Sequence, residues 1–72
     1  MGSFHDQFMD AWDELIYVEW RTHTTNRGLR DRMHEARELV DEDNDFKTRQ
    51  RGGQILREVR QECRRLREGL AA

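Results

Sequence analysis

The feature that most limits the fold of this chain is the spacing of its apolar residues. They recur every three or four positions in three separate stretches. That spacing puts apolar side chains on one face of an α-helix, because a helix completes a turn in about 3.6 residues. The chain also has no proline and few β-branched residues, and both properties favour helices over strands. The pattern therefore predicts an all-α protein, either a helical hairpin or a three-helix bundle.

The first predicted helix spans residues 3–21. Ser3 is suited to cap it, and Asp6, three residues later, completes a capping box. Its apolar positions cover roughly half of the circumference when residues are placed about 100° apart. These positions are Phe4, Phe8, Met9, Ala11, Trp12, Leu15, Ile16, Val18 and Trp20. One neighbouring helix covers less than half a circumference, so this helix is predicted to contact two surfaces, one inside the fold and one on a partner.

The centre and the flank of this apolar stripe are predicted to have different roles. Phe4, Phe8 and Leu15 lie along the centre and are expected in the core. The flank carries large side chains, including both tryptophans of the chain, and such residues are typical interface anchors. The predicted partner interface consists of Met9, Trp12, Ile16 and Trp20.

The second predicted helix spans residues 27–42 and has a narrow apolar stripe suited to one neighbour. The stripe consists of Leu29, Met33, Ala36 and Val40. An acidic run, residues 41–45, follows it. The helix dipole favours negative charge at the start of a helix and disfavours it at the end. The boundary is therefore expected within this run, with Asn44 or Asp45 capping the next helix.

The third predicted helix spans residues 45–70 and carries a heptad-like seam, with apolar positions alternately three and four residues apart. The seam consists of Leu56, Val59, Cys63, Leu66 and Leu70. Two glycines at 52–53 interrupt the good helix formers, and each costs about 1 kcal/mol inside a helix. Either the helix breaks at 52–53, or the glycines allow another helix to cross closely. The sequence leaves both alternatives open.

The length of the chain predicts one helical domain over residues 1–72. A chain this short buries a small fraction of its surface, and small folds often gain stability by self-association. Together with the wide apolar stripe of the first helix, this predicts a homodimer.

Charge is divided unevenly along the chain. Residues 1–46 hold twelve acidic and five basic side chains, whereas residues 47–72 hold three acidic and eight basic ones. Beside the seam of the third helix, four arginines fall within an arc of about 80°. This arginine stripe consists of Arg57, Arg60, Arg64 and Arg67.

The arginine stripe has two interpretations. In the first, it pairs with the acidic face of the first helix, within one chain or across a dimer; that face carries Asp6, Asp10, Asp13 and Glu14. In the second, it follows the phosphate backbone of a nucleic acid. The first is favoured, because charged faces of amphipathic helices are usually solvated or paired. The net charge is also −2, and no aromatic residue follows Phe46 to stack on bases.

Residues suited to catalysis or metal binding are few and scattered. The soft or borderline metal ligands are His5, His23, His34 and Cys63. A metal site needs several ligands that converge, and none of these has a second ligand-rich segment as a partner. The thiol occupies a seam position, where it acts as a small buried hydrophobic group. We predict no enzymatic activity, no metal, no cofactor and no small-molecule substrate.

Compartment and function follow from what remains. The single cysteine fits a reducing compartment, and no apolar run approaches the roughly 18 residues of a spanning helix. We predict a cytoplasmic protein that does not bind membranes. The favoured function is a small non-enzymatic protein-interaction module, such as an adaptor, an assembly factor or an inhibitor of a larger target, of the kind that phages and mobile elements encode. The alternative is a nucleic-acid-binding regulator that uses the arginine-rich third helix.

Overall fold

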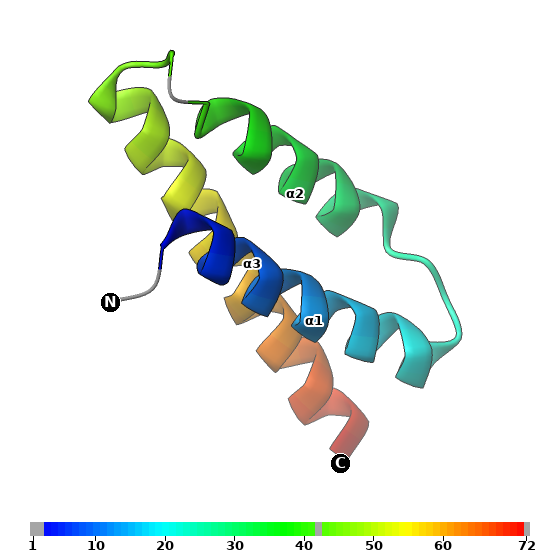
Figure 1. Ribbon diagram of the computed structural model, residues 1–72. Coiled ribbons are helices and arrows are strands. Elements are labelled where there is room, and N and C mark those ends of the chain that lie inside the picture. Colours follow the sequence, from blue (N-terminus) through cyan, green and yellow to red (C-terminus); the bar gives the residue numbers. More distant parts are fainter. Residues whose placement is uncertain (1–2, 42, 72) are drawn as a thin grey trace.

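The described part of the chain folds into three α-helices (Figure 1). The computed structural model describes residues 3–41 and 43–71, and no strand occurs in those two stretches. Helix α1 spans Phe4–Thr22, α2 spans Arg27–Leu39 and α3 spans Phe46–Ala71. Helices α1 and α3 run in the same direction, and α2 runs antiparallel to both. The all-α prediction is confirmed, and the architecture is that of three packed helices.

Local side-chain hydrogen bonds define the start of α1. The Ser3 hydroxyl accepts a hydrogen bond from the Asp6 backbone N–H at 3.2 Å, and the Asp6 carboxylate accepts one from the Ser3 N–H at 3.4 Å. The predicted capping box is therefore present. At the other end, His23 adopts a left-handed conformation with φ of 57° and donates its N–H to the Glu19 carbonyl. This conformation ends the helix and turns the chain toward α2.

The acidic run lies between α2 and α3. Helix α2 ends at Leu39, before this run, and the predicted end at Glu42 lies outside the described residues. The Asn44 side chain donates a hydrogen bond to the free Leu39 carbonyl at 3.1 Å. Asp45 then caps α3, because its carboxylate accepts the Thr48 N–H at 2.7 Å. The acidic run thus supplies the cap of α3, where the helix dipole favours a negative charge.

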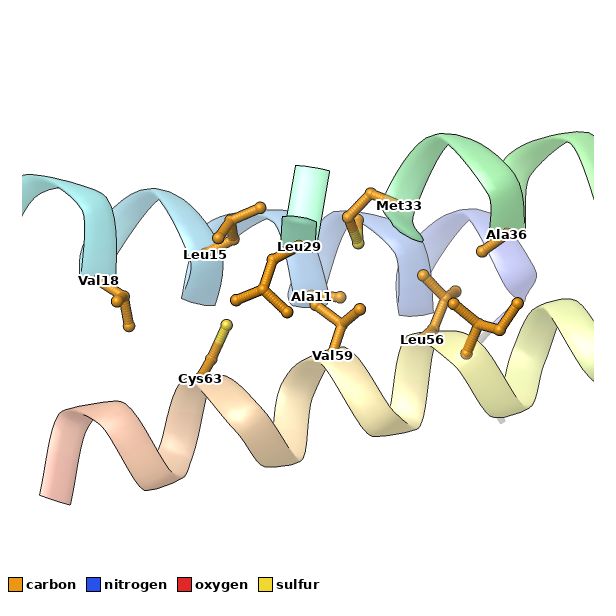
Figure 2. Packing of buried hydrophobic residues seen from close by; sticks show 10 residues of the cluster. Ala11, Leu15, Val18, Leu29, Met33, Ala36, Leu56, Val59 and Cys63 are labelled. Atoms are coloured by element: carbon orange, nitrogen blue, oxygen red, sulfur yellow. The ribbon is translucent and has the colours of Figure 1, made fainter. Parts of the chain in front are cut away.

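All three helices contribute to one apolar core, shown in Figure 2. Its buried residues are Ala11, Leu15, Val18, Leu29, Met33, Ala36, Ile55, Leu56, Val59 and Cys63. Both α1 and α2 pack mainly on α3 and only weakly on each other. Within the predicted seam, the first three positions are buried, Leu66 is half-buried, and Leu70 is 37% exposed. Helix α3 is therefore the central element of the fold.

Helix α3 continues without a break through both glycines. A Cβ atom added at Gly52 would lie 2.9 Å from the Ala36 carbonyl oxygen and would also collide with the Val40 side chain. A Cβ added at Gly53 would meet nothing within 4 Å. Gly52 therefore allows the last turn of α2 to lie directly on the α3 backbone. The close-crossing alternative applies to this glycine, and the other alternative, a break at 52–53, does not occur.

These two adjacent glycines should respond oppositely to alanine. Gly52→Ala forces α2 and α3 apart and should lower the free energy of unfolding by about 1–3 kcal/mol, as overpacking usually does. Gly53→Ala should raise it by about 0.5–1 kcal/mol, because alanine favours the helix and the added methyl group meets only solvent. Urea denaturation of both variants tests this. Equal effects of the two substitutions would contradict the close contact at Gly52.

Candidate interaction surfaces

One side of α1 leaves large apolar side chains in contact with solvent. Trp20 is 67% exposed, Ile16 44% and Met9 41%, whereas Ala11, Leu15 and Val18 on the opposite side of the helix are buried. Three of the four predicted interface residues therefore lie on the surface. We call these three residues the α1 outer face.

Trp12, the fourth predicted interface residue, is half-buried. Its ring is stacked against Phe8, with centroids 6.3 Å apart, and the Arg30 guanidinium lies 5.1 Å from its centroid. Trp12 therefore links α1 to α2 within the chain. Of the residues expected in the core, Leu15 is fully buried, whereas Phe8 and Phe4 are only partly buried against it.

An ion pair connects the end of α1 with the start of α2. Arg30 donates two hydrogen bonds to the Glu19 carboxylate, from Nε at 2.8 Å and from Nη2 at 2.6 Å. The Asn26 backbone N–H donates a third at 2.8 Å, and the Glu19 side chain is only 10% exposed. The hydrogen bonds from Arg30 lower the pKa of this carboxyl below its usual value; partial burial opposes the shift, and the Asn26 N–H adds to it.

Part of the arginine stripe engages α1 within the chain. Arg60 Nε donates to the Glu14 carboxylate at 3.0 Å, and Arg64 Nε lies 3.7 Å from its other oxygen. The Arg67 guanidinium lies 4.6 Å from the centroid of the Tyr17 ring, in cation–π geometry. Two of the four arginines thus pair with an acidic residue of α1, and a third contacts an aromatic ring of the same helix.

Fewer residues of the two charged faces pair with each other than the charge pattern predicts. Within residues 3–41 and 43–71, Glu14 is the acidic residue of α1 that pairs with the stripe, and Asp6, Asp10 and Asp13 form no ion pair there. In the same two stretches Arg57 has no ion-pair partner either. These three carboxylates of α1 and the guanidinium of Arg57 are exposed, and they are therefore available to bind other molecules.

A second cationic region lies on the first half of α3, and the sequence pattern did not indicate it. It forms a surface depression of about 640 Å³. Four cations from α3 line it, and the start of α1 supplies Phe4 and Gln7. The cations are Lys47, Arg49, Arg51 and Arg57. The start of α1 and the first half of α3 are brought together only by tertiary packing. The periodicity of a single helix therefore does not reveal this depression.

The cysteine and the three histidines lie in surroundings that do not favour catalysis or metal binding. Cys63 is fully buried, and this burial, with smaller contributions from nearby carboxylates led by Glu14, raises the pKa of its thiol to about 11. A thiol with that pKa stays protonated at neutral pH and is a poor nucleophile. His5, His23 and His34 are exposed, and over the described residues no three metal-ligating side chains cluster.

Comparisons with other proteins add no family to this description. Comparison with known protein families, curated protein sequences and solved structures found no match. Among the described helices, none combines the length and low charge that crossing a bilayer requires. The surfaces themselves are therefore the basis for inferring a function.

The Glu19–Arg30 pair should make stability depend on pH. A carboxyl whose folded-state pKa is lowered contributes its full stabilisation above the unfolded pKa of about 4.3, and loses it as the pH falls through the folded value. Glu19→Gln should therefore lower the denaturation midpoint at pH 7, and the difference from the wild type should shrink below about pH 4.3. Urea denaturation across this range measures it. Glu38→Gln, on an exposed side chain of α2, is the control and should change little at either pH.

Proposed function

We propose that this chain is a small non-enzymatic protein-interaction module, an adaptor, assembly factor or inhibitor, that binds a partner through the α1 outer face. The observation that carries the proposal is the exposure of Met9, Ile16 and Trp20 on a helix whose other side is buried. Large apolar groups gathered on a surface are typical of binding sites. A tryptophan on such a surface is a typical hot spot.

The position of α1 in the fold suits it to this role. Its inner side is packed in the core, and Glu14 and Glu19 attach it to α3 and α2 respectively. The helix is therefore already formed and oriented before binding. A preformed surface loses less conformational entropy on association, which favours affinity.

The charges beside the outer face indicate the chemistry of the partner. Asp6, Asp10 and Asp13 are exposed and make no ion pair with the described residues. A complementary partner would offer an apolar groove with a basic rim, since opposite charges across an interface raise the association rate and reject other partners. Proteins that bind nucleic acids have basic grooves of this kind. An inhibitor whose carboxylates imitate a phosphate backbone could occupy such a groove.

A second copy of the chain is the other candidate partner. We propose a homodimer in which the apolar residues of two outer faces are in contact, while the carboxylates beside them stay at the solvent-exposed rim. A wide apolar surface on a small fold is commonly covered by self-association. The module is proposed to act in the cytoplasm, because its single cysteine fits a reducing compartment.

Trp20→Ala should separate binding from folding. Because the ring is 67% exposed, truncation should leave the free energy of unfolding nearly unchanged, yet weaken association by about 2 kcal/mol. Leu15→Ala, in the core, should instead cost about 2–5 kcal/mol of stability. His34→Ala removes an exposed ring from α2 and should affect neither. Chemical denaturation measures the stability of each variant. Affinity purification from the native host, with nuclease-treated controls, measures its binding. Severe unfolding of Trp20→Ala would refute the outer-face proposal.

The homodimer proposal predicts a molar mass twice the 8.7 kDa of the chain at micromolar concentration. Ile16→Asp places a charge in the outer face and should return the mass to that of one chain, without loss of helicity. Light scattering with circular dichroism measures both quantities. A single-chain mass for the wild type at high concentration would reject the dimer and leave the outer face open to a different protein.

A further inference from the structure

The depression on the first half of α3 is lined by cations and by no carboxylate. Lys47, Arg49, Arg51 and Arg57 line it together with three glutamines. None of the four cations forms an ion pair with a residue in 3–41 or 43–71. Asp45 caps the helix and does not line the depression, although its charge interacts with that of Arg49. Arg51 also borders a second depression, which Glu35 and Glu58 line. The cationic depression therefore attracts anions.

Aromatic rings stand on two sides of these cations. Phe4, the first residue of α1, lines the depression. Phe46, the first residue of α3, is 65% exposed and belongs to none of the core contacts. Its spacing of four, seven and eleven residues from Gln50, Gly53 and Arg57 places it on the same helix face as the depression. An exposed ring beside a cationic surface has no role in the core and is available for stacking.

We propose that this part of α3 binds single-stranded nucleic acid. Lys47, Arg49 and Arg57 contact successive phosphates, and a base stacks on the Phe46 ring. Proteins that bind single strands without sequence preference combine a positive track for the backbone with aromatic rings for the bases. From Lys47 to Arg57 the helix rises about 15 Å, which is enough for a few nucleotides.

The aromatic rings favour a single strand over other polyanions. In a duplex the bases are stacked on each other, so a protruding phenylalanine reaches a base face only by unstacking a base step, which costs free energy. An acidic polypeptide would use the cations alone and would leave Phe46 without a contact. The proposed site includes Arg57 but not the rest of the arginine stripe, because Arg60, Arg64 and Arg67 contact Glu14 and Tyr17 of α1.

This surface is distinct from the α1 outer face. Gln7 lines the depression and Glu14 pairs with α3, whereas Met9 and Ile16 lie on the other side of α1. The proposal therefore goes beyond the protein-interaction function, and either can fail without the other. If both hold, the chain bridges a protein partner and a single strand.

Fluorescence anisotropy with a labelled mixed-sequence single strand of about 16 nucleotides tests the proposal on the full chain. The wild type should bind at low salt. Lys47→Gln with Arg57→Gln should weaken binding at least about tenfold and reduce the slope of log K against log salt by about 1.4, since each lost phosphate contact removes about 0.7. Arg27→Gln removes one positive charge from the start of α2, outside the depression, and should leave affinity and slope unchanged.

The aromatic contact needs its own variants. Phe46→Ala should weaken binding about tenfold, the effect of losing one stacked base, while circular dichroism stays that of the wild type because the ring is exposed. Phe46→Trp restores a stacking surface and should restore affinity. This rescue separates stacking from a general effect on the helix.

Several results would overturn the proposal. One is the absence of binding to the single strand at low salt; another is equal weakening by Arg27→Gln and by the Lys47 and Arg57 variant. Tighter binding of the matching duplex, or of polyglutamate, with no effect of Phe46→Ala would assign the cations to those ligands instead. Loss of the α1 outer face through Trp20→Ala bears only on the protein-interaction function.

Discussion

The close contact between α2 and α3 at Gly52 is the constraint on which the rest of the structure depends. Because no side chain separates the helices there, the last turn of α2 rests on the α3 backbone, and the α2 core residues Met33 and Ala36 reach Leu56 and its neighbours. Helix α2 is thereby held against α3 and contacts α1 only weakly. It follows that α2 does not cover the outer side of α1. The exposed apolar residues of α1 are a consequence of this arrangement.

Two partly buried carboxylates then fix the rotation of α1 about its own axis. Glu19 points toward Arg30 of α2, and Glu14 points toward Arg60 of α3, so the buried stripe between them faces the core. Such pairs add little net stability, because desolvation offsets much of the attraction, but they penalise other orientations. The rotation set by these pairs decides which apolar side chains of α1 remain exposed. It places Trp12 beneath Arg30 and leaves Trp20 in solvent.

The sequence predicts features whose causes are local and misses those that depend on a neighbour. The capping box of Ser3 and the cap at Asp45 follow from hydrogen bonds that span three residues, and both occur. The role of Gly52 was left open, because it depends on which helix crosses it. Burial of Trp12 depends on an arginine in another helix. The cationic depression on α3 was missed for the same reason, since the start of α1 forms one side of it.

The two roles of the α3 cations follow from what lies beside them. Phe4 and Gln7, near the start of α1, line the depression together with its four cations, and no carboxylate lines it. Further along α3, Arg60 and Arg64 lie within reach of Glu14 and contact it. The opposite charges of the two halves of the chain are thus neutralised over only part of α3. The unpaired remainder, an acidic side on α1 and a basic end on α3, is where outside partners of opposite charge are expected to bind.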